Sequence, residues 1–263
     1  MLIAIVSSVL GAAIASVGGP ILWFLWFYFS RYRRLLRFFG IDPSCPRIIL
    51  YISSLNVLRG GAVDASGQPR SYQGVALPGN EFQSIQSFAR TFGEIQTKPL
   101  YSVLRLLTRQ HWSLNVEPRV APSPLQSRDI DFANILTLGT PGYNEVTKYY
   151  QQRGAPWLRW DLANQQIQVC RGPQSGQNIP NPYNQDLAIL EKLIDDTHQT
   201  TVFVAAGLDV NGTRGAAEYL VANWRRLSTS YDDRAFAWCL SFPPAGQDPN
   251  GWRHATVLQR FPD

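Results

Sequence analysis

The fold is decided by one stretch, ANILTLGTPGYNEVT, at residues 133–147. An apolar run leads into the turn Gly139-Thr140-Pro141-Gly142, and the residues after it are spaced as in a helix. We interpret the stretch as a strand, a tight turn and the start of a helix. The first N–H groups of a helix and its positive dipole end favour negative charge. The stretch therefore predicts an anionic ligand above the end of the strand.

A second turn of the same design follows at residues 205–217, AAGLDVNGTRGAA. It too leads from an apolar run to a helical pattern. In an open sheet, ligands bind outside the carboxyl ends of the strands. Two such turns predict one shared site at that edge.

The apolar N-terminal segment contains no charged side chain from residue 2 to residue 29. As a helix it would be roughly 42 Å long, more than the roughly 30 Å of a hydrocarbon core. Arg31, Arg33, Arg34 and Arg37 follow it directly. The positive-inside rule then predicts a single-pass protein of the cell inner membrane, with the N-terminus outside and the soluble domain in the cytoplasm.

The predicted organisation is a transmembrane helix with a basic flank at residues 1–37, a linker at 38–46 and a ligand-binding domain at 47–263. Within the helix, Gly11, Ala15 and Gly19 lie four residues apart and would let helix backbones approach closely. A membrane is thus an expected partner, and we expect a homo-oligomer formed through the transmembrane helices.

The charge of the soluble part is nearly balanced. The chain has a formal net charge of +5, but from residue 38 onward it holds 20 basic and 19 acidic residues. This argues against duplex nucleic acid as a partner. The three cysteines, Cys45, Cys170 and Cys239, are widely spaced, which suits a reducing compartment. No cysteine or histidine spacing indicates a metal site, and no cofactor is expected.

The soluble part alternates strand and helix patterns, which predicts an α/β fold with a mostly parallel sheet covered on both faces and an antiparallel portion near the end. Residues 60–79 are expected to be a long loop, Pro118 to lie in a loop, and residues 172–184 to be a mobile flap. The expected strands are 47–54, 112–116, 157–162, 165–170, 187–194, 200–206, 236–242 and 256–261, and the expected helices begin near residues 80, 99, 144 and 216.

The candidate ligand-binding residues follow three strand ends. Arg214 could pair with a phosphate as a planar donor. The alternative is that these residues only satisfy turn and cap geometry. The full set is Ser53, Ser54, Asn56, Gly139, Thr140, Pro141, Asn144, Thr147, Asn211, Gly212, Thr213 and Arg214.

Common catalytic motifs do not occur. The chain lacks a Gly-Lys-Ser or Gly-Lys-Thr phosphate loop, a Gly-x-Gly-x-x-Gly fingerprint and a Gly-x-Ser-x-Gly elbow. Glu81 and Asp209 are the remaining carboxylates that could act as acid or base. Glu81 also fits an acid that merely favours a helix N-terminus.

A family resemblance rests on residues 51–54, residues 79–81, Gly139-Thr140-Pro141 with Asn144, and residues 206–217. These resemble a membrane-anchored, Rossmann-like bacterial domain, similar in plan to the nucleotide-sensing effector domains of bacterial defence systems. The resemblance covers about residues 47–262. It implies a Rossmann-like fold, binding of a nucleotide signal and a role in antiviral defence.

Three hypotheses result. The first is a membrane-anchored effector that senses a nucleotide-like anion and controls assembly or opening of its transmembrane helices. The second is an anchored nucleotide or nucleoside hydrolase that uses Glu81 or Asp209, with Asn144 orienting the substrate. The third is a scaffold for a partner protein, which a site filled by the chain's own side chains would favour.

Overall fold

The computed structural model describes residues 21, 23, 26, 29–53, 100–107, 114–121, 130–131, 133–142, 144–161, 164–182, 185–208, 210–243, 248 and 250–262. Two helical segments, 29–38 and 100–107, precede or interrupt the strands. The remaining elements are β1 (Arg47–Ile52), β2 (Asn115–Val120), β3 (Asn134–Leu138), α3 (Glu145–Arg153), β4 (Leu158–Asp161), β5 (Gln166–Val169), β6 (Asn178–Ile179), β7 (Asp186–Asp195), β8 (Thr200–Gly207), α4 (Val210–Tyr231), β9 (Phe236–Phe242), the 3₁₀ turn η3 (Gly251–Arg253) and β10 (Thr256–Phe261).

Seven strands form one sheet in the order β10-β9-β7-β8-β3-β1-β2. β2, β1, β3 and β8 are mutually parallel, while β7 is antiparallel to both of its neighbours and β10 is antiparallel to β9. Five of the seven strands therefore run in one direction. The predicted α/β fold with a mostly parallel sheet and an antiparallel portion is confirmed.

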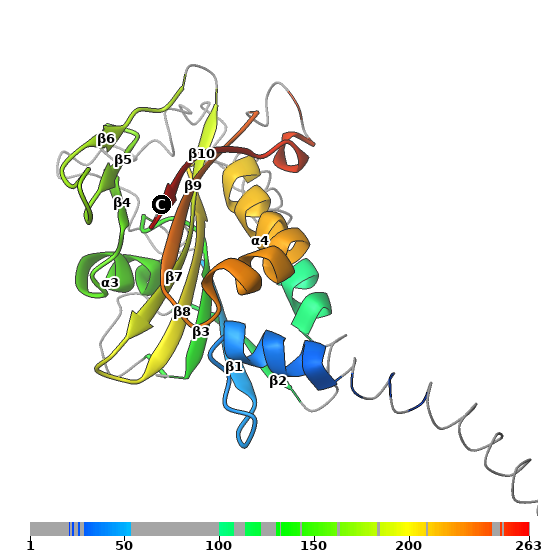
Figure 1. Cartoon of the computed structure of the whole chain (residues 1–263). Helices are drawn as coiled ribbons and strands as arrows, with labels where there is room; N and C mark the ends of the chain where they lie inside the picture. Colours follow the sequence, from blue (N-terminus) through cyan, green and yellow to red (C-terminus); the bar gives the residue numbers. More distant parts are fainter. Residues whose placement is uncertain are drawn as a thin grey trace, which may run out of the picture.

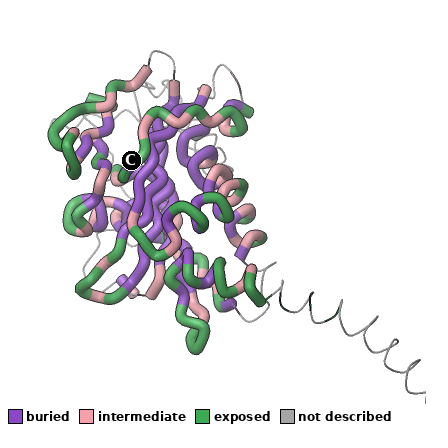
Figure 2. The backbone as a smooth tube through the Cα atoms, viewed as in Figure 1, coloured by how far each residue is buried: buried purple, intermediate pink, exposed green. Residues whose placement is uncertain are grey.

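Helices and a small second sheet cover the two faces of the large sheet (Figure 1). α4 and the helical segments 29–38 and 100–107 pack on one face, which we call the α4 face. α3 packs on the other face, and the three-stranded sheet β4-β5-β6 packs beside it over β7 and β9. The strands between these layers are almost wholly buried, as Figure 2 shows. Their residues are largely apolar because both faces of the sheet are covered.

Helix 29–38 belongs to the folded domain. Phe38 and Phe39 are fully buried, and the Phe203 ring of β8 lies 5.2 Å and 4.7 Å from theirs between ring centroids. Gly40 ends the helix with a positive φ of 68°, and the Ile41 N–H returns to the Leu36 carbonyl at 2.7 Å. This is the glycine-terminated helix end in which a left-handed residue satisfies the last carbonyls. The expectation of a linker at 38–46 is thus corrected at its start, where the apolar side chains join the core.

Two loop assignments also need correction. Pro118 lies within β2, which the sequence placed earlier, at 112–116. β2 is the last strand of the sheet, where proline is tolerated. Within 172–184, Asn178 and Ile179 form β6, which pairs with β5. The hairpin of β4 and β5 and the pairing of β7 with β8 are confirmed.

Several predictions concern residues outside the described part of the chain. They include most of the span 2–29, the loop 60–79 and the helix starting near residue 80. Among the residues that are described, no helix combines the length and apolar character needed to cross a membrane.

Candidate ligand site at the carboxyl edge of the sheet

The two predicted turns lie at the same edge of the sheet. The parallel strands β1, β3 and β8 end there, and the antiparallel β7 begins there with Asp186. After β1 the helical segment 100–107 packs on the α4 face, whereas α3, which follows β3, packs on the opposite face. Neighbouring strands whose connections leave to opposite faces create a crevice, which is the usual ligand position in α/β sheets.

Asn144 lies between the ends of β1 and β3 and is fully buried. It is the N-cap of α3: its Oδ1 accepts hydrogen bonds of 3.1 Å from the N–H groups of Val146 and Thr147. Its Nδ2 donates to the Leu138 carbonyl at 2.8 Å and to the Tyr51 carbonyl at 3.4 Å. One side chain therefore ties the ends of β1 and β3 to the start of α3. It also supplies the cap that an anion would otherwise provide.

The other residues of the first turn are similarly engaged. The Ser53 hydroxyl donates to the Leu138 carbonyl at 3.2 Å, and the Thr147 hydroxyl lies 2.7 Å from that of Thr137. Gly139 adopts a positive φ of 114°, and its N–H donates to the Ala205 carbonyl at 3.0 Å. The Thr140 carbonyl accepts from the Asn144 N–H at 2.9 Å, and Pro141 is half-buried beside it.

At the second turn, a carboxylate binds the N-terminus of the helix, whereas at the first turn the amide of Asn144 does so. Asp186, which is 2% exposed, accepts a hydrogen bond from the Gly212 N–H in the first turn of α4. A negative charge at this position is favourable at a helix N-terminus. A Cβ on Gly212 would lie 2.5 Å from the Asp186 Oδ1, so glycine is required for this approach.

Two further side chains close the second turn. The Thr213 hydroxyl accepts from the Gly207 N–H at 3.0 Å. Asn211 donates from Nδ2 to the carbonyls of Pro243 and Asp248, each at 2.9 Å. The start of α4 is thereby fixed both to the end of β8 and to the segment that follows β9.

Arg214 differs from the residues around it. Its guanidinium carbon lies 3.8 Å from the centroid of the Trp252 ring in η3, and Arg253 lies over the same ring at 4.9 Å. The Nε of Arg214 and the Nε1 of Trp252 are buried and have no hydrogen-bond partner among the described residues. Burial lowers the pKa of Arg214, and so does the nearby charge of Arg253, while Glu218 raises it. Because the guanidinium groups of Arg214 and Arg253 both lie over the Trp252 ring, this part of the edge is the best suited to bind a planar anion.

The structure thus brings together Ser53, Gly139, Thr140, Pro141, Asn144 and Thr147 at one turn, and Asn211, Gly212, Thr213 and Arg214 at the other. Ser54, Asn56, Glu81 and Asp209 lie outside the described residues. Sequence reasoning missed Asp186 and Trp252. Asp186 precedes the apolar run at residues 187–190, and Trp252 follows a glycine. Neither pattern indicates a contact with α4.

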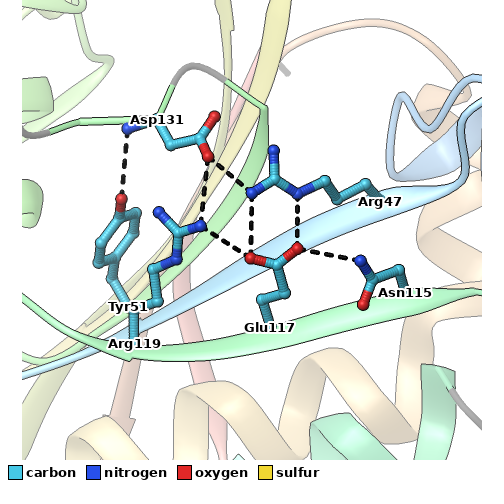
Figure 3. Close-up of polar contacts among 6 residues, drawn as sticks. All are labelled: Arg47, Tyr51, Asn115, Glu117, Arg119 and Asp131. Carbon is cyan, nitrogen blue, oxygen red and sulfur yellow. Dashed lines mark hydrogen bonds and ion pairs between the residues drawn. The ribbon is translucent and has the colours of Figure 1, made fainter.

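A second polar cluster joins β1 and β2 to Asp131 (Figure 3). Arg47 binds both carboxylate oxygens of Glu117, at 2.7 Å and 3.0 Å, and also binds Asp131 at 2.7 Å. Arg119 contacts the same two carboxylates, at 2.7 Å and 3.3 Å. Hydrogen bonds from the two arginines lower the pKa of Glu117 to about 2. Each charged side chain in the cluster forms an ion pair with a side chain of opposite charge. Because these ion pairs link β1 to β2, we call the cluster the ionic clamp.

The middle of β7 carries a buried carboxyl group. Glu191 is fully buried; its Oε1 accepts the Trp157 N–H at 2.5 Å, whereas its Oε2 has no hydrogen-bond partner among the described residues. Burial raises the pKa of Glu191 to about 8. The group anchors the connection between α3 and β4. Over the described part of the chain, no three His, Cys, Asp or Glu side chains are grouped to hold a metal ion.

Comparison with known proteins adds no relative: no protein-family model, curated protein or solved structure matches the chain.

Proposed function

We propose that the chain is a membrane-anchored effector whose Rossmann-like domain binds a nucleotide-like anionic ligand at the carboxyl edge and passes occupancy to the apolar N-terminal segment. The strand order β2-β1-β3-β8, with its crevice between β1 and β3, is in keeping with such a domain. A role in antiviral defence is part of this proposal through the resemblance described above.

One observation carries the proposal: strand β8 contacts both the candidate site and the N-terminal helical segment. At its carboxyl end, Gly207 contacts Thr213 in the first turn of α4. In the middle of β8, Phe203 packs against Phe38 of helix 29–38 and against Phe39, which directly follows that helix. Packed elements with two discrete arrangements can carry coupling over such distances. A ligand acts only if it binds one arrangement more tightly than the other.

The internal hydrogen bonds change how the ligand would be held. Asn144 and Asp186 already occupy helix N-termini. The anion would therefore be recognised mainly by Arg214, whose guanidinium stacks on the Trp252 ring.

Calorimetry on the full-length protein in lipid nanodiscs tests ligand binding, with a panel of cyclic and linear nucleotides. We expect one member to bind and Arg214→Gln to weaken it at least tenfold, in line with loss of a charge-assisted pair worth about 1.5–3 kcal/mol. Arg153→Gln, an exposed arginine on α3, is the matched control. Absence of binding by every nucleotide would overturn the proposal.

Coupling is tested in vesicles that contain a self-quenched dye. The ligand identified by calorimetry should release dye from vesicles with the wild-type protein. Phe38→Leu should reduce release while leaving affinity within about twofold, because it loosens only the junction with helix 29–38. Leu158→Val, which trims the separate cluster around β4 and β5, should leave release unchanged.

The scaffold hypothesis remains a second candidate, and a specific observation favours it. The polar side chains of Asn144, Thr147, Asn211 and Thr213 are all used within the fold. If no nucleotide binds and a partner protein protects Arg214 and Trp252 from chemical modification, the scaffold is the better description.

A further inference from the structure

Arginines stacked on tryptophan rings continue along the α4 face beyond the candidate site. Arg226 of α4 and Arg260 of β10 lie over the Trp238 ring, at 5.4 Å and 4.6 Å from its centroid. Arg260 is the register partner of Trp238 across β9 and β10, so the two side chains share one face of the sheet. Arg225 lies over the adjacent Trp224 at 5.6 Å.

Helix 29–38 extends this positive surface. Burial lowers the pKa of Arg225, and the nearby positive charge of Arg31 lowers it further. Both helices pack on the same face of the sheet, as Figure 1 shows. Between them, α4 and helix 29–38 contain one acidic residue, Glu218, whose carboxylate accepts the Ser102 hydroxyl at 2.6 Å.

Three of these guanidinium groups are held over aromatic rings, and carboxylates in the described part of the chain do not pair with them. Arg225, Arg226 and Arg260 form no ion pair with any residue that the structure describes. Arg226 donates one hydrogen bond of 2.6 Å to the Tyr219 hydroxyl, which fixes its position. A guanidinium stacked on a ring keeps its N–H edge available for phosphate oxygens.

The chain next to this surface indicates what it would meet. Exposed aromatic side chains precede Arg31: Trp23 is 62% exposed, Trp26 is 68% exposed and Phe29 is 52% exposed. Tryptophan is typical of the boundary between lipid and water, and basic residues beside it attract anionic headgroups.

We propose that Arg31, Arg225, Arg226 and Arg260, the arginine face, dock the folded domain flat against an anionic lipid bilayer. This inference rests on the membrane anchoring in the proposed function, but it does not depend on ligand binding. It fixes the orientation of the domain, because the α4 face would lie on the bilayer and the β4-β5-β6 sheet would point away from it.

The test measures how fast a guanidine-selective reagent, phenylglyoxal, modifies each arginine of the full-length protein, read by mass spectrometry. Neutral phosphatidylcholine vesicles are compared with vesicles that also contain phosphatidylserine. Anionic vesicles should slow modification of Arg225, Arg226 and Arg260 roughly fivefold or more, since each juxtamembrane arginine gains a comparable factor in binding. Arg153 and Arg171, on the opposite side of the sheet, should react equally in both.

A second experiment reverses the charge of selected arginines and measures protection from phenylglyoxal again. Arg225→Glu/Arg226→Glu should abolish protection of Arg260. Arg153→Glu/Arg171→Glu is the matched control, because these arginines also lie over aromatic rings, those of Tyr149 and Trp157. It should preserve the protection.

The outcomes separate the two proposals. Failure to float with neutral vesicles would count against the membrane anchor, and hence against the proposed function. Equal modification rates with both kinds of vesicle would overturn the arginine face alone. Protection by added RNA without vesicles, as strong as that by anionic lipid, would also overturn it and indicate a nucleic-acid surface.

Discussion

The ammonium nitrogen of Lys192 lies 5.2 Å from the centroid of the Phe38 ring and donates a hydrogen bond of 2.6 Å to the Asp232 carbonyl. Lys192 therefore joins β7, helix 29–38 and the segment after α4 at one buried point. Asp232 also forms an ion pair of 3.4 Å with Arg37. Arg37 in the basic flank and Lys192 in the sheet thus bind the same residue, Asp232.

Replacement of this buried cation should stabilise the domain near neutral pH. Burial lowers the pKa of Lys192 from 10.5 to about 8. The contribution of Lys192 to the free energy of unfolding is therefore lowest below pH 8. It rises between pH 8 and 10.5, where Lys192 has lost its proton in the folded state but keeps it in the unfolded state. Lys192→Met should raise the free energy of unfolding at pH 7 by about 1 kcal/mol and remove that rise. Urea unfolding at pH 7 and pH 10 measures both effects; a variant less stable at pH 7 would contradict the prediction.

Glu191 should show the opposite dependence. Its pKa is raised from 4.5 to about 8, so stability is greatest below pH 4.5 and falls as the pH rises to 8. Glu191→Gln keeps an oxygen that can accept the Trp157 N–H and removes the charge. We expect the variant to match the wild type at pH 4.5 and to be more stable at pH 8. Thermal unfolding across this range is the measurement, and unchanged pH dependence would refute the assignment.

The two neighbours together predict a minimum of stability near pH 8. Glu191 contributes a decline up to that pH, and Lys192 contributes a rise beyond it. Glu191→Gln/Lys192→Met should flatten the minimum, because neither group then titrates. Chemical unfolding from pH 5 to pH 10 compares the double variant with the wild type. Equally deep minima would show that other groups cause the dependence.

The ionic clamp on β1 and β2 should make stability depend on pH in the acidic range. Because hydrogen bonds from Arg47 and Arg119 lower the pKa of Glu117 from 4.5 to about 2, its contribution is present above pH 4.5 and is lost toward pH 2. Glu117→Gln should cost about 1 kcal/mol at pH 7, and less in high salt because the cluster is partly exposed. Equilibrium unfolding with and without 1 M salt, about enough to reduce the Debye length to 3 Å, tests this. A salt-independent loss would point to packing instead.

Asn144 should be costly to replace even without any ligand. Asn144→Ala removes the cap of α3 and two hydrogen bonds to strand ends, which together predict a loss of about 2–3 kcal/mol in the free energy of unfolding. Asn223→Ala on α4, which loses one hydrogen bond of 3.0 Å to the Tyr219 carbonyl, is the control and should cost less than about 1 kcal/mol. If Asn144→Ala is as mild as the control, the structural role assigned here is wrong.

Much of the fold follows from the sequence because β3, β7, β8 and β9 are largely apolar, and because glycine stands at the ends of β3 and β8. The charged pair Glu191–Lys192 did not prevent a correct strand prediction for 187–194, since the flanking residues are apolar. Pro118 was misread because a sequence does not reveal which strand will be outermost. Phe38 and Phe39 were misread because their partners, Phe203 and Phe236, lie far away in the chain.

The candidate site was predictable only in position. The two turns do lie at one edge, as the strand–turn–helix patterns indicated. However, the carboxylate of Asp186 and the ring of Trp252 reach that edge through long-range pairing, which no local pattern encodes. Ligand binding by the twelve candidate residues stays a prediction.

Pro118 also bears on how copies of the chain can associate. The N–H groups of Asn115 and Ala121 donate to the carbonyls of Pro46, directly before β1, and of Ile52, at its end, so the N–H groups of the even-numbered residues of β2 face outward. Proline has no N–H, and the outer rim therefore lacks its central donor between Val116 and Val120. A strand from another copy that tried to extend the sheet here would leave a carbonyl unpaired. Intermolecular strand addition is disfavoured at this rim, which leaves assembly to other surfaces of the chain.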